Sequence, residues 1–156
     1  MKKKYVYVLV GFILILLSSI VLLDVNKSNE TKETKEDVAL KNVIIEIVQT
    51  SNEIDLAKAT NFDWDTMYVF TPYSNPIDIL IKDGISTYNS RFSIEVLDTI
   101  NMIGFIKSNK LVAFVELPRS SVEVDLRTPS KFTKNEAYFN VLKDKKTIIF
   151  DHSQMK

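Results

Sequence analysis

The sequence contains no cysteine and has few glycines, prolines and histidines. Its 156 residues include three glycines, four prolines and one histidine. Without cysteine the chain has no disulfides, no thiolate nucleophile, no zinc or iron–sulfur site with sulfur ligands and no lipid-modified cysteine. The only histidine, His152, lies among the last five residues. This position argues against a histidine-dependent triad, and a single histidine excludes a metal site with several histidine ligands.

The chain also lacks the short motifs that bind nucleotides or activate a serine. The patterns G-x-G-x-x-G, P-loop and G-x-S-x-G are all absent. Neither charge is in excess, with 20 basic and 20 acidic residues, and residues 38–156 contain 14 basic and 15 acidic ones. Because nucleic acids and anionic lipids attract a basic surface, we expect no nucleic-acid partner. We also expect no cofactor, no bound metal and no enzymatic activity.

The N-terminal segment differs in kind from the rest of the chain. Three lysines at positions 2–4 precede 19 uncharged, mostly apolar residues at 5–23. A helix of that length spans about 28 Å, close to the hydrocarbon thickness of a bilayer. The segment therefore predicts one transmembrane helix in a cytoplasmic membrane. Lysines favour the cytoplasmic side, so the N-terminus is predicted inside and the C-terminal domain outside.

A cleaved signal peptide is the alternative interpretation of this segment. Signal peptides have a shorter apolar region and end in a small-x-small site, whereas residues 18–23 offer no good site of that kind. We therefore favour an uncleaved signal anchor. The predicted organisation is a basic cytoplasmic end at 1–4, an anchor at 5–23, a flexible charged tether at 24–37 and an extracytoplasmic domain at 38–156.

The domain shows both helical and alternating apolar patterns. Helical spacing at 38–48 and a helix start at Asn75 and Pro76, followed by Gly84, predict about two helices. The β-branched residues at 43–48 leave a strand as an alternative for the first. Alternating segments predict strands at 53–56, 66–71, 92–97, 99–106, 111–117, 137–142 and 147–150. Consecutive hairpins then indicate a single small α+β domain with a mostly antiparallel sheet.

The densest aromatic cluster lies at residues 61–73 and includes the only tryptophan. If the alternation begins at residue 64, Trp64, Tyr68 and Phe70 share one face of a strand. One interpretation is a core strand. The other is a binding groove lined by aromatic side chains and rimmed by charged ones, the type of surface that binds ligands or proteins. The candidate groove residues are Asp63, Trp64, Asp65, Tyr68, Tyr73 and Arg119.

Asp63 and Asp65 flank Trp64 and form the most prominent carboxylate pair. In an extended segment their side chains lie on one face, about 6–7 Å apart. Such a pair can bind a hard cation or act as acid and base. Aspartates at this spacing also commonly cap turns or pair with lysine or arginine. We favour the second role.

The aromatic segment resembles a known signature. Residues 62–73 read F-D-W-D-T-M-Y-V-F-T-P-Y, with I-D-L at 54–56 and V-E-L-P-R at 115–119. The first run is similar to the W-D-x-[MV]-Y-x-F-x-P-Y motif of a family of small, secreted or membrane-anchored bacterial proteins without an assigned activity. The resemblance covers roughly residues 53–141. It implies a shared fold and a location in the cell envelope, and it implies no catalytic residue.

These observations lead to two classes of function. The first is a non-enzymatic, membrane-anchored module that binds a protein or another envelope component through an edge strand or the groove. An inhibitor or immunity-like surface protein is a special case of it. The alternative is a cell-envelope hydrolase using Asp63, Asp65 or Glu116, which needs two carboxyl groups across a cleft, one of them with a raised pKa. A spacer role is the third hypothesis.

Overall fold

The computed structural model describes residues 33–128 and 130–151, so the predicted membrane anchor and His152 lie outside the described residues. Within those ranges no helix is long and apolar enough to cross a membrane. The α+β class is confirmed. This part of the chain has three α-helices where about two were predicted, and two sheets where one was predicted.

The helices and strands follow one another in mixed order along the chain. The α-helices are α2 (Val38–Thr50), α3 (Leu56–Ala59) and α4 (Pro76–Lys82), and the short 3-10 helices are η1 (Ser93–Glu95), η2 (Lys134–Glu136) and η3 (Lys143–Lys145). The strands are β1 (Glu53–Asp55), β2 (Thr66–Phe70), β3 (Ile100–Lys107), β4 (Lys110–Pro118), β5 (Glu123–Thr128), β6 (Lys131–Thr133), β7 (Tyr138–Leu142) and β8 (Thr147–Asp151).

The strands form two four-stranded sheets. The β3 sheet has the order β4-β3-β2-β6, and the β8 sheet has the order β1-β7-β8-β5. Neighbouring strands are antiparallel except for the parallel pair β5–β8. The pairs β3–β4 and β7–β8 are hairpins of the kind that the sequence predicts, whereas β1–β7, β2–β6 and β5–β8 join strands that are distant in the chain. Strand β5 follows β4 of the β3 sheet and lies at the edge of the β8 sheet.

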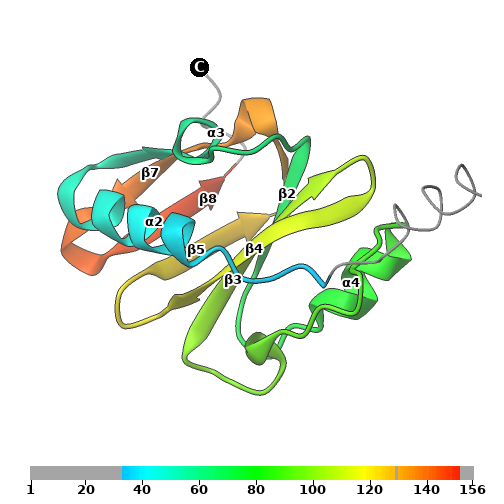
Figure 1. Cartoon of the computed structure of the whole chain (residues 1–156). Helices are drawn as coiled ribbons and strands as arrows, with labels where there is room; N and C mark the ends of the chain where they lie inside the picture. The colour runs from blue at the N-terminus through cyan, green and yellow to red at the C-terminus, as the bar shows by residue number, and fades with distance from the viewer. Residues whose placement is uncertain (1–32, 129, 152–156) are drawn as a thin grey trace, which may run out of the picture. The chain divides into compact units, whose positions relative to one another are not determined.

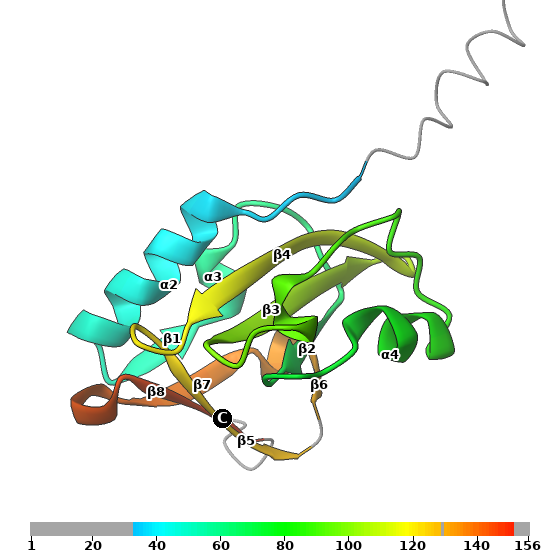
Figure 2. The same ribbon diagram turned by 90° about the horizontal axis from the view of Figure 1, so that it is seen from below.

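The β3 sheet is apolar on both faces and lies between two cores (Figure 1). Met67 and Val69 of β2 point into the core shared with the β8 sheet, which α2 covers with Leu40, Ile44 and Val48. The alternate residues of β2 point into a second core, which α4 and the segment around η1 cover. Figure 2 shows α2 and α4 on opposite sides of β3 and β4. Because successive side chains of a strand point to opposite faces, β2 contributes residues to both cores.

Local signals explain where several elements begin and turn. The Asp37 side chain accepts a hydrogen bond from the backbone N–H of Leu40 and caps α2. Asn75 caps α4 in the same way, with Pro76 in the first turn. Ser108 and Asn109 join β3 to β4 with φ values of 48° and 58°, the left-handed pair that a tight hairpin turn requires.

Two predicted features are wrong. Residues 92–97 do not form a strand, because the Glu116 carboxylate accepts hydrogen bonds from the backbone N–H groups of Ser93 and Ile94 and curls this segment into η1. The spacing of Ile77, Leu80 and Ile81 also predicts one apolar face of α4, but Leu80 is buried whereas Ile81 is 58% exposed. The short strand β6 and the strand β5, with its alternating charged residues, were not predicted.

The last residues of the predicted tether lie along the outer edge of β4. The Thr34 hydroxyl donates to the Leu111 carbonyl at 2.8 Å, and the Asp37 N–H donates to the Phe114 carbonyl at 2.8 Å. Between them, a Glu36 carboxylate oxygen accepts from the Glu116 N–H at 3.0 Å. The folded unit therefore begins at about residue 33, and the chain enters it at the Leu111 end of β4.

Candidate functional site

Trp64 is a core residue, with 1% of its surface exposed. Its indole N–H donates to the Thr60 hydroxyl at 2.8 Å, and its ring packs edge-on against Phe105 at 5.3 Å between centroids. The Lys134 ammonium lies 5.6 Å from the ring centroid. The indole N–H has its hydrogen-bond partner inside the domain, and the ring is buried. Trp64 therefore stabilises the fold and is not accessible to a ligand.

Tyr68 is also buried, but in the other core. It is 2% exposed, and its hydroxyl donates to the Asp83 carboxylate at 2.5 Å. Burial, and then Asp83, raise the pKa of the Tyr68 hydroxyl far above its usual value. The predicted common aromatic face is wrong, because β2 begins at Thr66 and the chain turns before it. Trp64 and Tyr68 therefore lie on opposite sides of the β3 sheet.

The carboxylates of Asp63 and Asp65 form ion pairs with lysine side chains. The Lys107 ammonium lies 2.9 Å from Asp63 and 2.7 Å from Asp65, and Lys134 lies 3.5 Å from Asp63. Asp65 also accepts from the Ser108 N–H at 3.0 Å. The hydrogen bonds from Lys107 lower the pKa of both carboxyl groups, and the two carboxylates raise the pKa of Lys107 to about 12. The pair therefore has the structural role that we favoured.

This ion-pair cluster gives the domain a pH dependence with a defined sign. Because the folded pKa values of Asp63 and Asp65 are depressed, the cluster stabilises the fold above their usual value of 3.8. The contribution is lost as pH falls through the folded values. We expect Lys107→Met to be less stable than the wild type at pH 7. That difference should shrink between pH 4 and pH 2, measured by urea unfolding.

Lys110→Met is the matched control for this comparison. Lys110 is exposed, lies on the same hairpin, and takes part in no ion pair among the described residues. Its stability difference from the wild type should stay constant with pH. A constant difference for Lys107→Met as well would mean that the lysine stabilises the fold through its methylenes alone.

The third carboxylate of the hydrolase hypothesis lies apart from this pair. Glu116 is opposite Met102 on β3, whereas Asp65 bonds to the backbone of Ile106. Four residues of strand separate these positions by about 13 Å. The Glu116 carboxylate also caps the two N–H groups of η1. The pKa values of Asp63 and Asp65 are lowered, and Glu116 does not face them across a cleft as this hypothesis requires.

Arg119 lies at the far end of the β3 sheet from Asp63 and Asp65. Its N–H donates to the Thr99 carbonyl, while the N–H of Asp65 donates to the Ile106 carbonyl. Seven residues of β3 separate these two carbonyls, which corresponds to about 23 Å. The six predicted groove residues therefore do not form one site. They divide into a lysine-clamped pair, two core aromatics, and a separate end that holds Tyr73 and Arg119.

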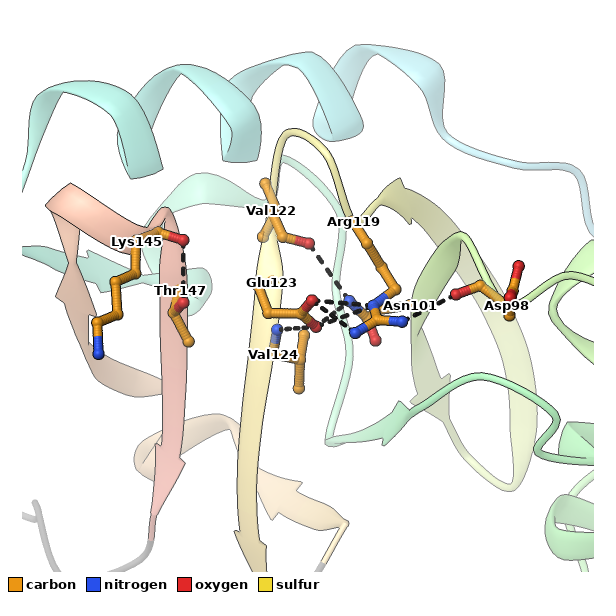
Figure 3. A network of polar contacts seen from close by, with 8 residues as sticks. All are labelled: Asp98, Asn101, Arg119, Val122, Glu123, Val124, Lys145 and Thr147. Carbon is orange, nitrogen blue, oxygen red and sulfur yellow. Dashed lines mark hydrogen bonds and ion pairs between the residues drawn. The ribbon is translucent and has the colours of Figure 1, made fainter.

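The guanidinium of Arg119 is held in a network of polar contacts (Figure 3). It pairs with the Glu123 carboxylate through Nε and Nη2, both at 2.9 Å, and donates to the Asp98 carbonyl at 3.0 Å. The bond to Glu123 raises the pKa of Arg119. Burial alone would raise the pKa of Glu123, but hydrogen bonds from Arg119, Val124 and Asn101 together lower it. The charge of Arg119 is therefore neutralised within the domain.

Asn101 connects this network to the core. It is fully buried, and its Nδ2 group donates to the Val122 carbonyl and to Glu123, both at 3.3 Å. Both partners are acceptors, which fixes the orientation of the amide. Its Oδ1 atom is buried and has no hydrogen-bond partner within the described ranges. Asn101 thus fastens β3 to the start of β5, the strand that joins the two sheets.

An open cleft of about 470 Å³ lies beside Arg119. Its lining comes from the start of β3 and from the end of β4, and comprises Asp98, Thr99, Ile100, Pro118, Arg119 and Ser120. The adjacent segment after η1 exposes two apolar side chains, with Val96 76% and Leu97 43% exposed. The cleft is therefore bordered by hydrophobic surface that the domain itself does not cover.

Tyr73 completes this end of the molecule. It is 68% exposed, has a φ of 62°, and its N–H donates to the Ile94 carbonyl of η1 at 3.1 Å. We call the exposed residues that surround η1, together with the cleft that begins at Asp98, the η1 surface. Its side chains are Tyr73, Glu95, Val96, Leu97 and Asp98. The sequence indicated Tyr73 and Arg119, but Val96 and Leu97 were assigned to a strand and were therefore missed.

Within residues 33–128 and 130–151, no three acidic or histidine side chains are grouped in a way that could hold a metal ion. No protein-family model matches the chain, and no curated protein or solved structure matches it. The resemblance of residues 62–73 to a bacterial envelope family stays a prediction. The structure does assign roles within that segment, since Trp64, Tyr68 and Phe70 are buried whereas Tyr73 is exposed.

Proposed function

We propose that this protein is a non-enzymatic binding module, anchored in the cytoplasmic membrane by residues 5–23, which holds a protein partner outside the cell at its η1 surface. The observation that carries the proposal is the exposure of Tyr73, whose N–H bonds to Ile94 of η1, together with that of Val96 and Leu97, which follow η1 in the chain. A surface inhibitor or immunity-like protein would use the same surface. The clamped carboxylates give the hydrolase hypothesis no comparable support.

The backbone of Tyr73 supports a role other than packing. Bulky residues rarely adopt a positive φ, and the conformation costs about 1–3 kcal/mol. Here it directs the ring out of the second core, although Tyr68 and Phe70 of the same segment are buried there. Aromatic side chains that are held in solvent are typical anchors of protein interfaces. The backbone of Tyr73 is therefore fixed by its bond to Ile94, while the ring stays outside the second core.

The position of the η1 surface suits a tethered domain. The chain enters beside Leu111, at one end of β4, while the cleft lies beside Pro118, at the other end. Seven residues of strand place the two ends about 23 Å apart. The η1 surface therefore lies at the end of β4 opposite to the one where residues 33–34 enter the folded unit.

Photo-crosslinking in intact cells tests this function. A photoreactive benzophenone amino acid in place of Val96 is expected to give a discrete partner adduct, identified by mass spectrometry. Combining it with Tyr73→Ser should reduce the adduct severalfold, since aromatic anchors carry much of the energy of an interface.

Val38 provides the matched control, because it is a 54% exposed valine on α2. The same photoreactive group at position 38 should give no such adduct. Equal adducts at both positions, or none at position 96, would contradict a specific interface at η1. Retention of the chain in the membrane pellet after a carbonate wash tests the anchor separately.

A further inference from the structure

We infer that the η1 surface takes a basic, apolar segment of a partner polypeptide, one that presents a lysine or arginine side chain next to a hydrophobic one. This inference rests on the proposed binding function and specifies the chemistry of the partner.

The charges around the η1 surface are predominantly acidic. Residues 91–98 and 116–123 together contain two arginines and four carboxylates, a net charge of −2. In the part of the chain that the structure describes, neither Glu95 nor Asp98 has an ion-pair partner for its carboxylate. Arg119 is already neutralised by Glu123. Arg91, before η1, is the one cation of these two segments without an ion pair in the described ranges, so a partner meets two unpaired carboxylates against one unpaired cation, a net charge of −1.

An acidic partner finds no free cation at this cleft. The guanidinium of Arg119 bonds to both carboxylate oxygens of Glu123 and to the Asp98 carbonyl. An incoming anion would have to break these bonds and would then approach Glu123 and Asp98. Arg91, the other arginine of this segment, has no ion pair in the described ranges and lies before η1. The electrostatics thus discriminate between partners of opposite charge.

The apolar part of the surface matches the stem of a long cationic side chain. Ile100, Pro118 and Asp98 line the cleft, and the exposed Leu97 precedes Asp98 in the chain. Lysine and arginine lay their methylenes on apolar surface while their charged ends stay with polar groups. Tyr73 adds an exposed ring, and a ring face attracts cations. The same segment can therefore cover Val96 with an apolar side chain and place its cation at Asp98.

A peptide-binding experiment on the full chain in nanodiscs tests this inference. The probes are three sets of synthetic peptides with equal apolar content, carrying lysine and arginine, aspartate and glutamate, or serine and asparagine. We expect binding to the basic set alone. Replacing both carboxylates by Glu95→Gln and Asp98→Asn should weaken that binding about fivefold to tenfold. The double reversal Glu95→Lys and Asp98→Lys should transfer the preference to the acidic set.

Val38→Ser and Val96→Ser leave the charges unchanged and test whether an apolar contact at the η1 surface contributes to binding. The first should leave binding of the basic set unchanged, and the second should weaken it. Binding of all three sets with equal affinity, still dependent on Val96, would overturn the basic segment but leave the binding function standing. If none of the three sets binds, the inference of a basic segment is also overturned. If the photoreactive group at position 96 gives no adduct in cells, the proposed binding function itself is contradicted, whatever the peptides show.

Discussion

Trp64→Ala is expected to lower the free energy of unfolding of the domain by about 3–5 kcal/mol, the usual cost of removing a fully buried tryptophan. The substitution leaves a cavity beside Phe105 and removes the hydrogen bond to Thr60. It also removes a large buried side chain from the core between the two sheets. Urea unfolding followed by far-UV circular dichroism measures the effect, because Trp64 is the only tryptophan and its fluorescence disappears with it.

Two further variants show which part of Trp64 matters. Trp64→Phe keeps a buried ring and loses the indole N–H, so we expect a smaller loss of about 1–2 kcal/mol. Tyr73→Ala removes an exposed aromatic side chain from the same segment and should change stability by no more than about 0.5 kcal/mol. A Trp64→Ala variant as stable as Tyr73→Ala would contradict the burial of the indole and would restore Trp64 as a groove residue.

Asn101→Asp is expected to destabilise the domain by about 3–5 kcal/mol at pH 7, although it changes the side chain by a single group. An uncompensated charge in a buried site costs that much. Where Nδ2 now donates, a carboxylate oxygen would face the Val122 carbonyl and the Glu123 carboxylate. Three acceptors would then meet in a site that is fully buried. The stability of the wild type and of the variant, measured over a range of pH, gives the difference.

The pH dependence and a second substitution identify the cause. Burial and Glu123 raise the folded pKa of the new carboxyl group, so its stability deficit is small near pH 4 and grows as pH rises through that pKa. Adding Glu123→Gln removes the repelling charge and leaves Arg119 to pair with the new carboxylate, so most of the loss should be recovered. A deficit that is independent of pH, and not reduced by Glu123→Gln, would indicate a packing defect.

The elements that the sequence predicts are those with local causes. Helix α2 follows from apolar spacing and the Asp37 cap, and the β3–β4 hairpin follows from two alternating runs joined by Ser108 and Asn109. Thr133 and Glu136 form a capping box around η2, and the alternating run that follows forms the predicted strand β7. Each of these signals acts within a few residues, so the surrounding fold does not override it.

The errors arise where distant residues decide. Alternation from Trp64 to Phe70 predicts one aromatic face only if the strand is continuous, but β2 begins at Thr66. The segment 92–97 has strand-like composition, yet a carboxylate from β4 supplies the hydrogen bonds that bend it. The sheet likewise separates Arg119 from Asp65. A pattern in a single sequence does not indicate which distant residues will contact one another.

The η1 surface is consequently visible only in part from the sequence. The sequence indicates Tyr73 as an aromatic lining residue and Arg119 as a charged rim residue of the candidate groove. The structure brings both to the same end of the β3 sheet and shows that Arg119 is neutralised. Val96 and Leu97 become surface residues because η1 replaces the predicted strand. The charge and the hydrophobicity of this surface are thus products of the tertiary fold.

The docking of residues 34–37 along β4 has a mechanical consequence. Glu36 pairs with Phe114 in the parallel direction, so a pull from residue 33 along the strand axis acts on the contacts at Thr34, Glu36 and Asp37 together. Bonds that lie across the direction of pull share the load, whereas bonds at the tip of a peeling strand fail one after another. The segment therefore behaves as a shear clamp, and tension on the tether reaches β4 before it reaches α2.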